Sequence, residues 1–460
     1  MSSAVQPARR VAFEVIRAVS ESDAYANLLL PVKLERAKLH GADAALATEL
    51  TYGTLRQQGL YDRVIERAAG RPLERIDPPI LDVLRLATHQ LLSLRVAQHA
   101  AVDEAVSLAR LVGSRSATGF VNGVLRTITR TAPDEWRSLV IGEQSSADDR
   151  LAAEFSHPVW IVRAFRQALA ADGRDEDLDK LLSADNAAPG VTLAALPGLA
   201  LREELDGTRP GDLSPVAAHS SGGDPSRLAA VRDGRARVQD EGSQLAALAL
   251  SRARPIERGE RWLDLCAGPG GKAALLAAEA LAGGATLVAN ELSPARAGLV
   301  RNALAVFDDA PQVLEDDGRT LGHQLAGTLD RVLLDAPCTG LGALRRRPEA
   351  RWRKQLSDLP SLTGLQLELV SAAAAALKPG GLLAYVTCSP HLAETRVAVA
   401  HAVQKCGLVL LDTPAILADI AGRDPDVRGN GAAQLWPHIH GTDAMFIALL
   451  EKPREDGGHR

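Results

Sequence analysis

The first 130 residues carry apolar side chains at helical spacing. Apolar residues recur every three or four positions over 11–19, 102–112 and 121–128, the period of one face of an α-helix. Pro72 and Pro78 stand between such stretches, where a proline ends one helix or opens the next. The pattern predicts an all-helical domain over residues 1–130.

Residues 131–236 have no sustained hydrophobic period. They are rich in polar residues, and proline–glycine pairs mark turns at 189–190, 197–198 and 210–211. We therefore expect a connector followed by a small α+β domain in this stretch.

From residue 237 onward, short apolar runs alternate with helical stretches. The predicted strands are 262–265, 286–289, 313–314, 332–334 and 382–386, and the predicted helices are 273–282, 294–307, 362–377 and 394–405. This βαβ alternation predicts a parallel, doubly wound sheet of the Rossmann-like α/β class, which binds ligands at the carboxyl ends of its strands. We expect this domain to span 237–453, with a disordered tail at 454–460.

Composition narrows the classes of protein to consider. Of the 460 residues, 46% are apolar and 24% are charged, as in ordinary globular chains. No apolar run approaches the roughly 18 residues that cross a bilayer, and the first residues lack a signal-peptide pattern. We expect a cytoplasmic protein with no membrane partner. The formal net charge of −5 neither indicates nor excludes a polyanionic partner.

The metal-binding residue types are sparse. The four cysteines are too few and too scattered for a disulfide framework or an all-cysteine zinc site, and the 11 histidines show no metal-ligand spacing. We expect no metal, and any functional cysteine should act as a thiol.

A glycine-rich turn follows the first predicted strand of the α/β domain. Its sequence is Cys266-Ala267-Gly268-Pro269-Gly270-Gly271-Lys272, and it opens a helix whose N–H groups suit an anionic or carboxylate-bearing ligand. It is not a phosphate-binding P-loop, because Cys266 and Ala273 stand where glycine and serine or threonine are required. Glu291 ends the next strand, where an acidic residue binds ribose hydroxyls. Nicotinamide dinucleotide and S-adenosylmethionine both satisfy this pattern.

Two further strands are each followed by a cysteine. Cys338 comes just after strand 332–334, and Cys388 just after strand 382–386. Either cysteine alone is explained as a small buried apolar residue, and a dehydrogenase does not require the pair. Methylation of carbon 5 of a pyrimidine does use two such groups. A thiolate adds to carbon 6, and a base later removes the proton from carbon 5.

Several motifs recur in a fixed order along nearly the whole chain. They are VQDEGSQ (238–244), DLCAGPGGK (264–272), DGR (317–319), DAPCTG (335–340), RRPE (346–349), TCS (387–389), LWPH (435–438) and TD (442–443). Together they resemble the RNA cytosine-5 methyltransferases of the RsmB (Sun/Fmu) type, which modify bacterial small-subunit ribosomal RNA and relate to the Nop2/Sun enzymes. With TELTYG (48–53) and FVNGVLR (120–126), the first 130 residues are similar to the NusB-like RNA-binding domain of that subfamily.

The resemblance implies a class I S-adenosylmethionine site. Residues 266–272 would contact the methionine half of the cofactor, Glu291 the ribose and Asp317 the adenine. Asp335 would stand near the methyl donor and the target base. Ala273 departs from the family pattern, in which threonine usually follows the lysine.

The resemblance also assigns the thiols. Cys388, in the Thr-Cys motif, matches the nucleophile of the family, and Cys338, in the Pro-Cys motif, matches the second cysteine, associated with product release. DNA cytosine-5 methyltransferases instead use the cysteine of a Pro-Cys motif. The short segment between the two cysteines contains no DNA target-recognition domain, so we expect Cys388 to attack and DNA not to be a partner.

The resulting expectation is a monomeric enzyme that uses S-adenosylmethionine to methylate carbon 5 of a cytosine in small-subunit ribosomal RNA through a covalent cysteine adduct. A noncatalytic RNA-binding ribosome-assembly or antitermination factor is the alternative, and a nicotinamide-dependent oxidoreductase is a third reading. The basic stretch 345–354 should contact RNA phosphates, unless it is merely a solvated helix start.

Overall fold

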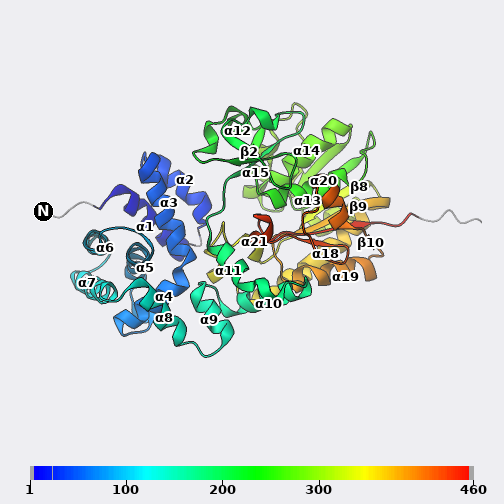
Figure 1. Cartoon of the computed structure of the whole chain (residues 1–460). Helices are drawn as coiled ribbons and strands as arrows, with labels where there is room; N and C mark the ends of the chain where they lie inside the picture. Colours follow the sequence, from blue (N-terminus) through cyan, green and yellow to red (C-terminus); the bar gives the residue numbers. More distant parts are fainter. Residues whose placement is uncertain (1–4, 23, 455–460) are drawn as a thin grey trace, which may run out of the picture. The chain divides into compact units, whose positions relative to one another are not determined.

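The computed structural model describes residues 5–22 and 24–454, and the chain divides into two compact units. Within the described residues, the helical unit comprises residues 5–22, 24–163, 182–187 and 344–353. The sheet unit comprises 164–181, 188–343 and 354–454. Figure 1 shows the chain coloured from blue at the N-terminus to red at the C-terminus, with the helices and strands labelled where there is room. Of the expected disordered tail, residues 455–460 lie outside the described part of the chain.

The helical unit confirms the all-helical prediction for the described residues of the first 130, which are 5–22 and 24–130. Its helices are α1 (Pro7–Ser22), α2 (Ala26–Arg36), α3 (Gly41–Arg56), α4 (Gln58–Ala69), α5 (Pro78–Ser93), α6 (Gln98–Val112), α7 (Arg115–Thr129), α8 (Pro133–Gly142), α9 (Ala147–Glu154) and α17 (Ala350–Arg353). The apolar stripes read from the sequence face inward, since Ile16, Val121 and Ile128 are buried in one core. Ser114 caps α7 by accepting the Ala117 N–H.

Two helices cross the boundary between the units along the chain. They are α10 (Val159–Ala171) and α11 (Leu178–Asn186). No helix within residues 5–22 and 24–454 has the length and apolar character needed to span a membrane.

The expected small α+β region contains a four-stranded antiparallel sheet. Its strands run in the order β2 (Thr208–Pro210), β3 (Ala217–Ser220), β1 (Thr192–Ala195) and β4 (Ala236–Val238), with α12 (Ala229–Arg232) preceding β4. Apolar residues of this sheet, among them Leu193 and Ala218, form a small core of their own.

The larger sheet of the sheet unit follows the predicted βαβ alternation. Its strands run in the order β10 (Val409–Leu410), β12 (Phe446–Glu451), β9 (Leu377–Thr387), β8 (Leu329–Asp335), β5 (Arg261–Asp264), β6 (Thr286–Asn290) and β7 (Gln312–Leu314), and β11 (Ala433–Gln434) pairs with β12. The helices are α13 (Glu241–Arg252), α14 (Gly271–Gly283), α15 (Pro294–Leu304), α16 (Gly318–Gln324), α18 (Leu359–Ala376), α19 (Arg396–Gln404), α20 (Thr413–Ala421) and α21 (Pro437–His440).

The sheet is mixed, which corrects the expectation of a purely parallel sheet. Strands β5 to β9 pair in parallel, but β12 pairs antiparallel with both β9 and β10. An apolar run such as 446–451 reads the same in either direction, so the sequence pattern does not reveal strand polarity. Antiparallel strands at one side of a mainly parallel sheet are common in doubly wound folds.

Both faces of the large sheet are covered by helices. Along β8 the side chains alternate, so that Leu333 packs in the core with α13 and α14, whereas Val332 and Leu334 pack with α16, α18 and α19. The edge formed by the carboxyl ends of β5, β6, β7, β8 and β9 remains for binding, as expected for this architecture.

Candidate functional site

The glycine-rich turn between β5 and α14 has a shape that only glycine permits at two positions. A Cβ atom on Gly268 would lie 2.3 Å from Oε2 of Glu291. Gly270 has a φ of +104°, and a Cβ there would lie 2.6 Å from the Cβ of Ala303. The turn can therefore pass close to the end of β6 and leave the N-terminus of α14 accessible to a ligand.

Asp264, the last residue of β5, is fully buried. Its oxygens make no hydrogen bond of ordinary geometry within the described residues, although the Cys266 N–H faces the carboxyl group. Burial, with the nearby charge of Asp335, raises the pKa of Asp264 to about 8. Burial also raises the pKa of Cys266 well above its ordinary range, so that Cys266 is a neutral thiol.

Lys272 forms an ion pair across this edge of the sheet. Its Nζ atom donates a hydrogen bond of 2.8 Å to Oδ2 of Asp335, the last residue of β8. Burial alone would lower the pKa of Lys272, but Asp335, with smaller contributions from Cys388 and Asp264, raises it. A charged ammonium group therefore stands beside the Asp335 carboxylate and near the Asp264 and Cys388 side chains.

Glu291 fastens the glycine turn to the segment after β6. One carboxylate oxygen accepts the Gly268 N–H at 3.1 Å, and the other accepts the Ser293 N–H at 3.0 Å. The Arg296 guanidinium lies 3.2 Å from the Glu291 carboxylate. The expected ribose-binding residue is thus fixed in place next to the turn.

Asn290, just before Glu291, ties three strand ends together. Its Nδ2 atom donates to the carbonyls of Leu265 and Asp316, and its Oδ1 atom accepts the Asp316 N–H. Asp317, the residue expected at the adenine, caps α16 and is partly exposed. The Arg319 side chain binds the Asp317 carboxylate and lowers its pKa.

The two cysteines of the Pro-Cys and Thr-Cys motifs meet at the ends of β8 and β9. The Sγ atoms of Cys338 and Cys388 lie 3.5 Å apart. The neighbouring Cys388 thiol and burial raise the pKa of Cys338 well above the usual range. Cys338 therefore keeps its proton, whereas Cys388 is the thiol whose negative charge Lys272 can stabilise.

These residues fit a cationic ligand such as S-adenosylmethionine, which carries a sulfonium and an ammonium group. Three carboxyl groups lie at this edge, those of Asp264, Asp335 and Glu291. The buried oxygens of Asp264 lack hydrogen-bond donors of ordinary geometry among the described residues. A cationic donor placed there would satisfy them and lower the pKa of Asp264. The residues present are thus compatible with the cofactor that the sequence motifs imply.

Sequence reasoning did not single out several residues that shape this edge. Asp264 lies inside a quoted motif at a strand end, and Asn290 directly precedes Glu291, so both carried a signal of position. Arg296 carried none, because its pairing with Glu291 depends on how the segment after β6 folds.

Within the basic stretch after the Pro-Cys motif, Arg351 does not have the role expected from the charge of the stretch. Arg351 is fully buried within the helical unit. Its guanidinium donates hydrogen bonds of 2.8 to 3.2 Å to the carbonyl oxygens of Arg56, Ser156 and Asp185 and to Oδ1 of Asn186.

These acceptors lie at or just past the carboxyl ends of α3, α9 and α11, where helix carbonyls have no partner within the helix. Arg353 donates in the same way to the carbonyls of Val19 and Ala24 at the end of α1. The expectation that the stretch contacts RNA phosphates is wrong for Arg351, which is fully buried, and Nη2 of Arg353 also binds inside the protein. The reading as a solvated helix start is wrong for Arg351 as well.

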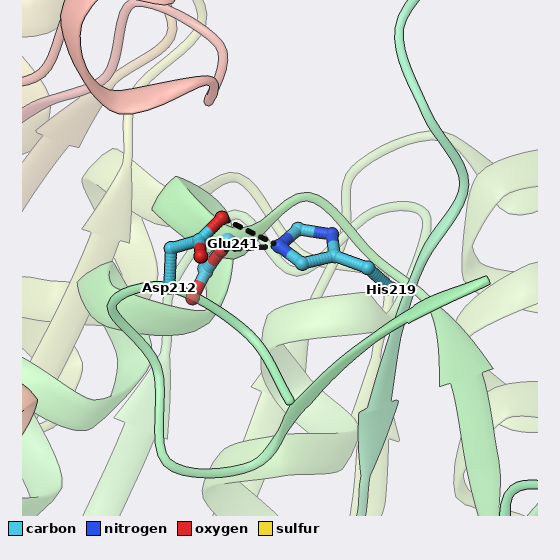
Figure 2. Close-up of side chains that lie close together, drawn as sticks. All are labelled: Asp212, His219 and Glu241. Atoms are coloured by element: carbon cyan, nitrogen blue, oxygen red, sulfur yellow. Dashed lines mark ion pairs between the residues drawn. The ribbon is translucent and has the colours of Figure 1, made fainter. Parts of the chain in front are cut away.

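A separate group of titratable side chains lies beside the small sheet (Figure 2). Nε2 of His219 is 3.3 Å from Oδ2 of Asp212 and 3.2 Å from Oε2 of Glu241. The other oxygen of Glu241 accepts the backbone N–H groups of Leu213 and Ser214. The three groups are close enough together to hold a metal ion, which histidine spacing in the sequence did not indicate. Their hydrogen bonds fasten the turn before β3 to the start of α13.

Comparisons with known proteins agree with the two-part layout. Residues 253–451 match the family described as 16S rRNA methyltransferase RsmB/F, and residues 6–130 match the NusB family. A protein named as a methyltransferase in Mycobacterium tuberculosis is 50% identical over 456 residues, which cover 97% of each chain. Ribosomal RNA small subunit methyltransferase B of Pseudomonas putida is 31% identical over 465 residues, which cover 96% of this chain and 98% of that one.

Similarity to solved structures concerns the fold. The crystal structure of PH0851 has a TM-score of 0.80 with this chain at 22% sequence identity, covering 98% of this chain and 100% of the other.

Proposed function

Because the chain belongs to the RsmB/F family of 16S rRNA methyltransferases, we propose that it methylates carbon 5 of a cytosine in small-subunit ribosomal RNA, with S-adenosylmethionine as methyl donor. The observation that carries the proposal is the pair of thiols, Cys338 and Cys388, 3.5 Å apart at neighbouring strand ends. They lie on the same edge of the sheet as Lys272, Asp335 and the glycine turn.

The chemistry of the target explains why two thiols are useful. Carbon 5 of cytosine is a poor nucleophile until the Cys388 thiolate adds to carbon 6 and pushes electrons toward carbon 5. The bound cofactor supplies an electrophilic methyl group to carbon 5. A base then removes the proton from carbon 5, the carbon 5–carbon 6 double bond forms again, and Cys388 leaves as thiolate. Cys338 assists this last step.

Electrostatics favour Cys388 as the nucleophile. The contact with Cys388 itself and burial raise the pKa of its neighbour Cys338 and hold it as a neutral thiol. The Lys272 ammonium stabilises a thiolate at Cys388, and Asp335 keeps Lys272 in place through the 2.8 Å hydrogen bond. Lys272 and Asp335 thus raise the reactivity of the Cys388 thiol. Asp335 also faces the position proposed for the methyl donor.

The cofactor would be held by the residues that line the strand ends. We assign residues 266–272 and Asp264 to its methionine half, Glu291 to the ribose and Asp317 to the adenine. The carboxyl groups suit the cationic substrate of the transfer better than its neutral thioether product, which favours product release.

RNA recognition is assigned to residues 1–130, which include the NusB match. The target cytosine should be single-stranded or turned out of a helix, because a base stacked in a duplex is out of reach of a buried thiol.

Methyl transfer to RNA lacking the modification tests the proposal. The full chain is incubated with methyl-labelled S-adenosylmethionine and small-subunit RNA from a strain deleted for the gene, and the RNA is digested to nucleosides. Label in 5-methylcytidine is the expected result. Absence of label under conditions where the RNA binds would favour the noncatalytic assembly factor, and label in another nucleoside would overturn the cytosine assignment.

A further inference from the structure

A buried carboxyl group contacts the residues next to the two thiols and has no part in the proposed methyl transfer. Glu394 ends the 3-10 turn η7 (Leu392–Glu394), just before α19, and is fully buried. Burial of such a group costs free energy unless hydrogen bonds compensate for the lost water. Its partners therefore show what the group does in the fold.

Each oxygen of Glu394 contacts two donor-bearing groups. Oε1 accepts the backbone N–H of Thr339 at 2.7 Å and Nε2 of Gln366 at 3.3 Å. Oε2 lies 2.5 Å from Oγ1 of Thr339 and 2.6 Å from Oγ of Ser389. All four contacts are to neutral groups of the sheet unit, so Glu394 is not half of a salt bridge with any of them.

Two of the contacted residues directly follow the cysteines. Thr339 follows Cys338, and Ser389 follows Cys388, and their hydroxyl oxygens are 3.1 Å apart. Glu394 thus joins the loop after β8 to the loop after β9 at the residue next to each thiol.

Neighbouring bonds extend this connection. Gln366, on α18, also donates to the carbonyl of Pro337 at 2.8 Å, one residue before Cys338. The Tyr385 hydroxyl donates to the backbone carbonyl of Glu394 at 2.6 Å, which fixes η7 against β9. The carboxyl group is therefore held from several sides and forms a rigid link between the loops.

We propose that Glu394 is a positioning residue that holds Cys338 and Cys388 at the spacing needed to act on neighbouring carbons of one base. The inference rests on the proposed cysteine mechanism. A side chain misplaced by about 1 Å can lower a reaction rate by about a hundredfold, so loss of the link should slow methyl transfer without weakening cofactor binding.

The spacing of the thiols can be measured without the methylation reaction. Dibromobimane becomes fluorescent when it bridges two thiols that lie close together, and peptide mass spectrometry locates the bridge. In the full chain without cofactor, we expect Glu394→Ala to slow bridging of Cys338 to Cys388 at least about fivefold. Bridging at the wild-type rate would overturn the proposal.

Glu279→Ala is the matched control. Glu279 is also a buried carboxylate of the sheet unit, where it accepts from Ser251 and Arg252 on α13. Its loss should destabilise the protein while leaving bridging at the wild-type rate. An equal slowing in Glu279→Ala and Glu394→Ala would assign the effect to general destabilisation and overturn the proposal.

Single-turnover methyl transfer supplies the second readout. We expect Glu394→Ala to lower the rate at least about tenfold with a cofactor Kd within about twofold of wild type. Glu394→Gln should recover part of the rate, because its amide oxygen can accept the two N–H groups and its NH2 group can donate to the hydroxyl oxygens. Equal loss in both variants, or an unchanged rate in Glu394→Ala, would contradict a positioning role. If the wild type methylates no cytosine, the proposed function fails, while the bridging result still tests the link.

Ser389→Ala and Thr339→Val keep the test usable if Glu394→Ala does not fold. Each removes one hydroxyl contact of Oε2 and leaves the carboxyl group in place. Slower bridging in both variants supports the link, and wild-type bridging in both overturns it.

Discussion

The Sγ atoms of Cys338 and Cys388 lie 3.5 Å apart, although the residues come from separate loops at the ends of β8 and β9. Parallel strands that are neighbours in the sheet bring their carboxyl ends together, so the two loops face each other. The two thiols differ in surroundings, because Lys272 acts on Cys388, whereas the contact with Cys388 and burial keep Cys338 protonated.

Replacing each cysteine should therefore give a different result. Cys388→Ala should form no covalent adduct with RNA, because the nucleophile is absent. Cys338→Ala should methylate once and then stall, since the adduct is not released. The stalled protein–RNA complex is detected on a denaturing gel. A trapped complex that appears only in Cys388→Ala would exchange the roles of the two thiols.

The buried Asp264 makes stability depend on pH. In the unfolded chain its pKa is near 3.8, whereas in the folded protein it is about 8. Between these values the folded state keeps a proton that the unfolded state has lost, so stability falls as pH rises from about 4 to about 8 and then levels off.

Asp264→Asn removes this titration and serves as the reference. Without cofactor, the free energy of unfolding of the wild type relative to Asp264→Asn should fall between pH 5 and 8, by at most about 1.4 kcal/mol per pH unit. Urea unfolding at several pH values measures it. A difference that stays constant over this range would show that Asp264 is ionised throughout.

Gly268→Ala should weaken cofactor binding. The added Cβ would lie 2.3 Å from Oε2 of Glu291, so the turn or the proposed ribose ligand must move. We expect the Kd for S-adenosylmethionine to rise about tenfold, equivalent to about 1.4 kcal/mol. Gly298→Ala on α15 is the control, because its Cβ meets nothing within 4 Å. Calorimetric titration showing equal Kd values for the two variants would contradict the site assignment.

Arg351→Met should destabilise the helical unit. It removes the hydrogen bonds to the carboxyl ends of three helices and leaves their carbonyls buried. We expect a loss of about 3–5 kcal/mol in urea unfolding. Arg347→Met is the matched control, because Arg347 is exposed and its replacement should cost less than about 0.5 kcal/mol. Similar losses in both variants would show that the buried bonds add little.

The sequence predicted the elements better than their connections. The runs at 332–334 and 382–386 became β8 and β9 because continuous apolar segments of this length suit a sheet that is covered on both faces. The nearness of Cys338 and Cys388 followed from that topology. The antiparallel direction of β12 did not, because it depends on how the chain returns to the sheet.

Charge patterns were less informative than apolar patterns. The basic run around Arg351 looked like a surface for phosphates, but Nη1 and Nη2 of Arg351 bind helix ends that come from three parts of the chain. Glu394 had no visible signal either, since its partners Thr339 and Gln366 are distant in sequence. Such roles arise from tertiary contacts that local spacing does not encode. The catalytic and cofactor-binding roles of the individual residues stay predictions.

In the proposed reaction, Cys388 attacks a cytosine whose carbon 5 then receives the methyl group. RNA substrate in which cytidine is replaced by 5-fluorocytidine tests it directly, because fluorine at carbon 5 cannot be removed as a proton and the adduct persists. After incubation with the full chain and S-adenosylmethionine, the protein is digested and its peptides are mapped by mass spectrometry. We expect a methylated fluorocytidine attached to the peptide that contains Cys388. Attachment to Cys338, or methylation of ordinary cytidine with no trapped adduct on the fluorinated RNA, would contradict it.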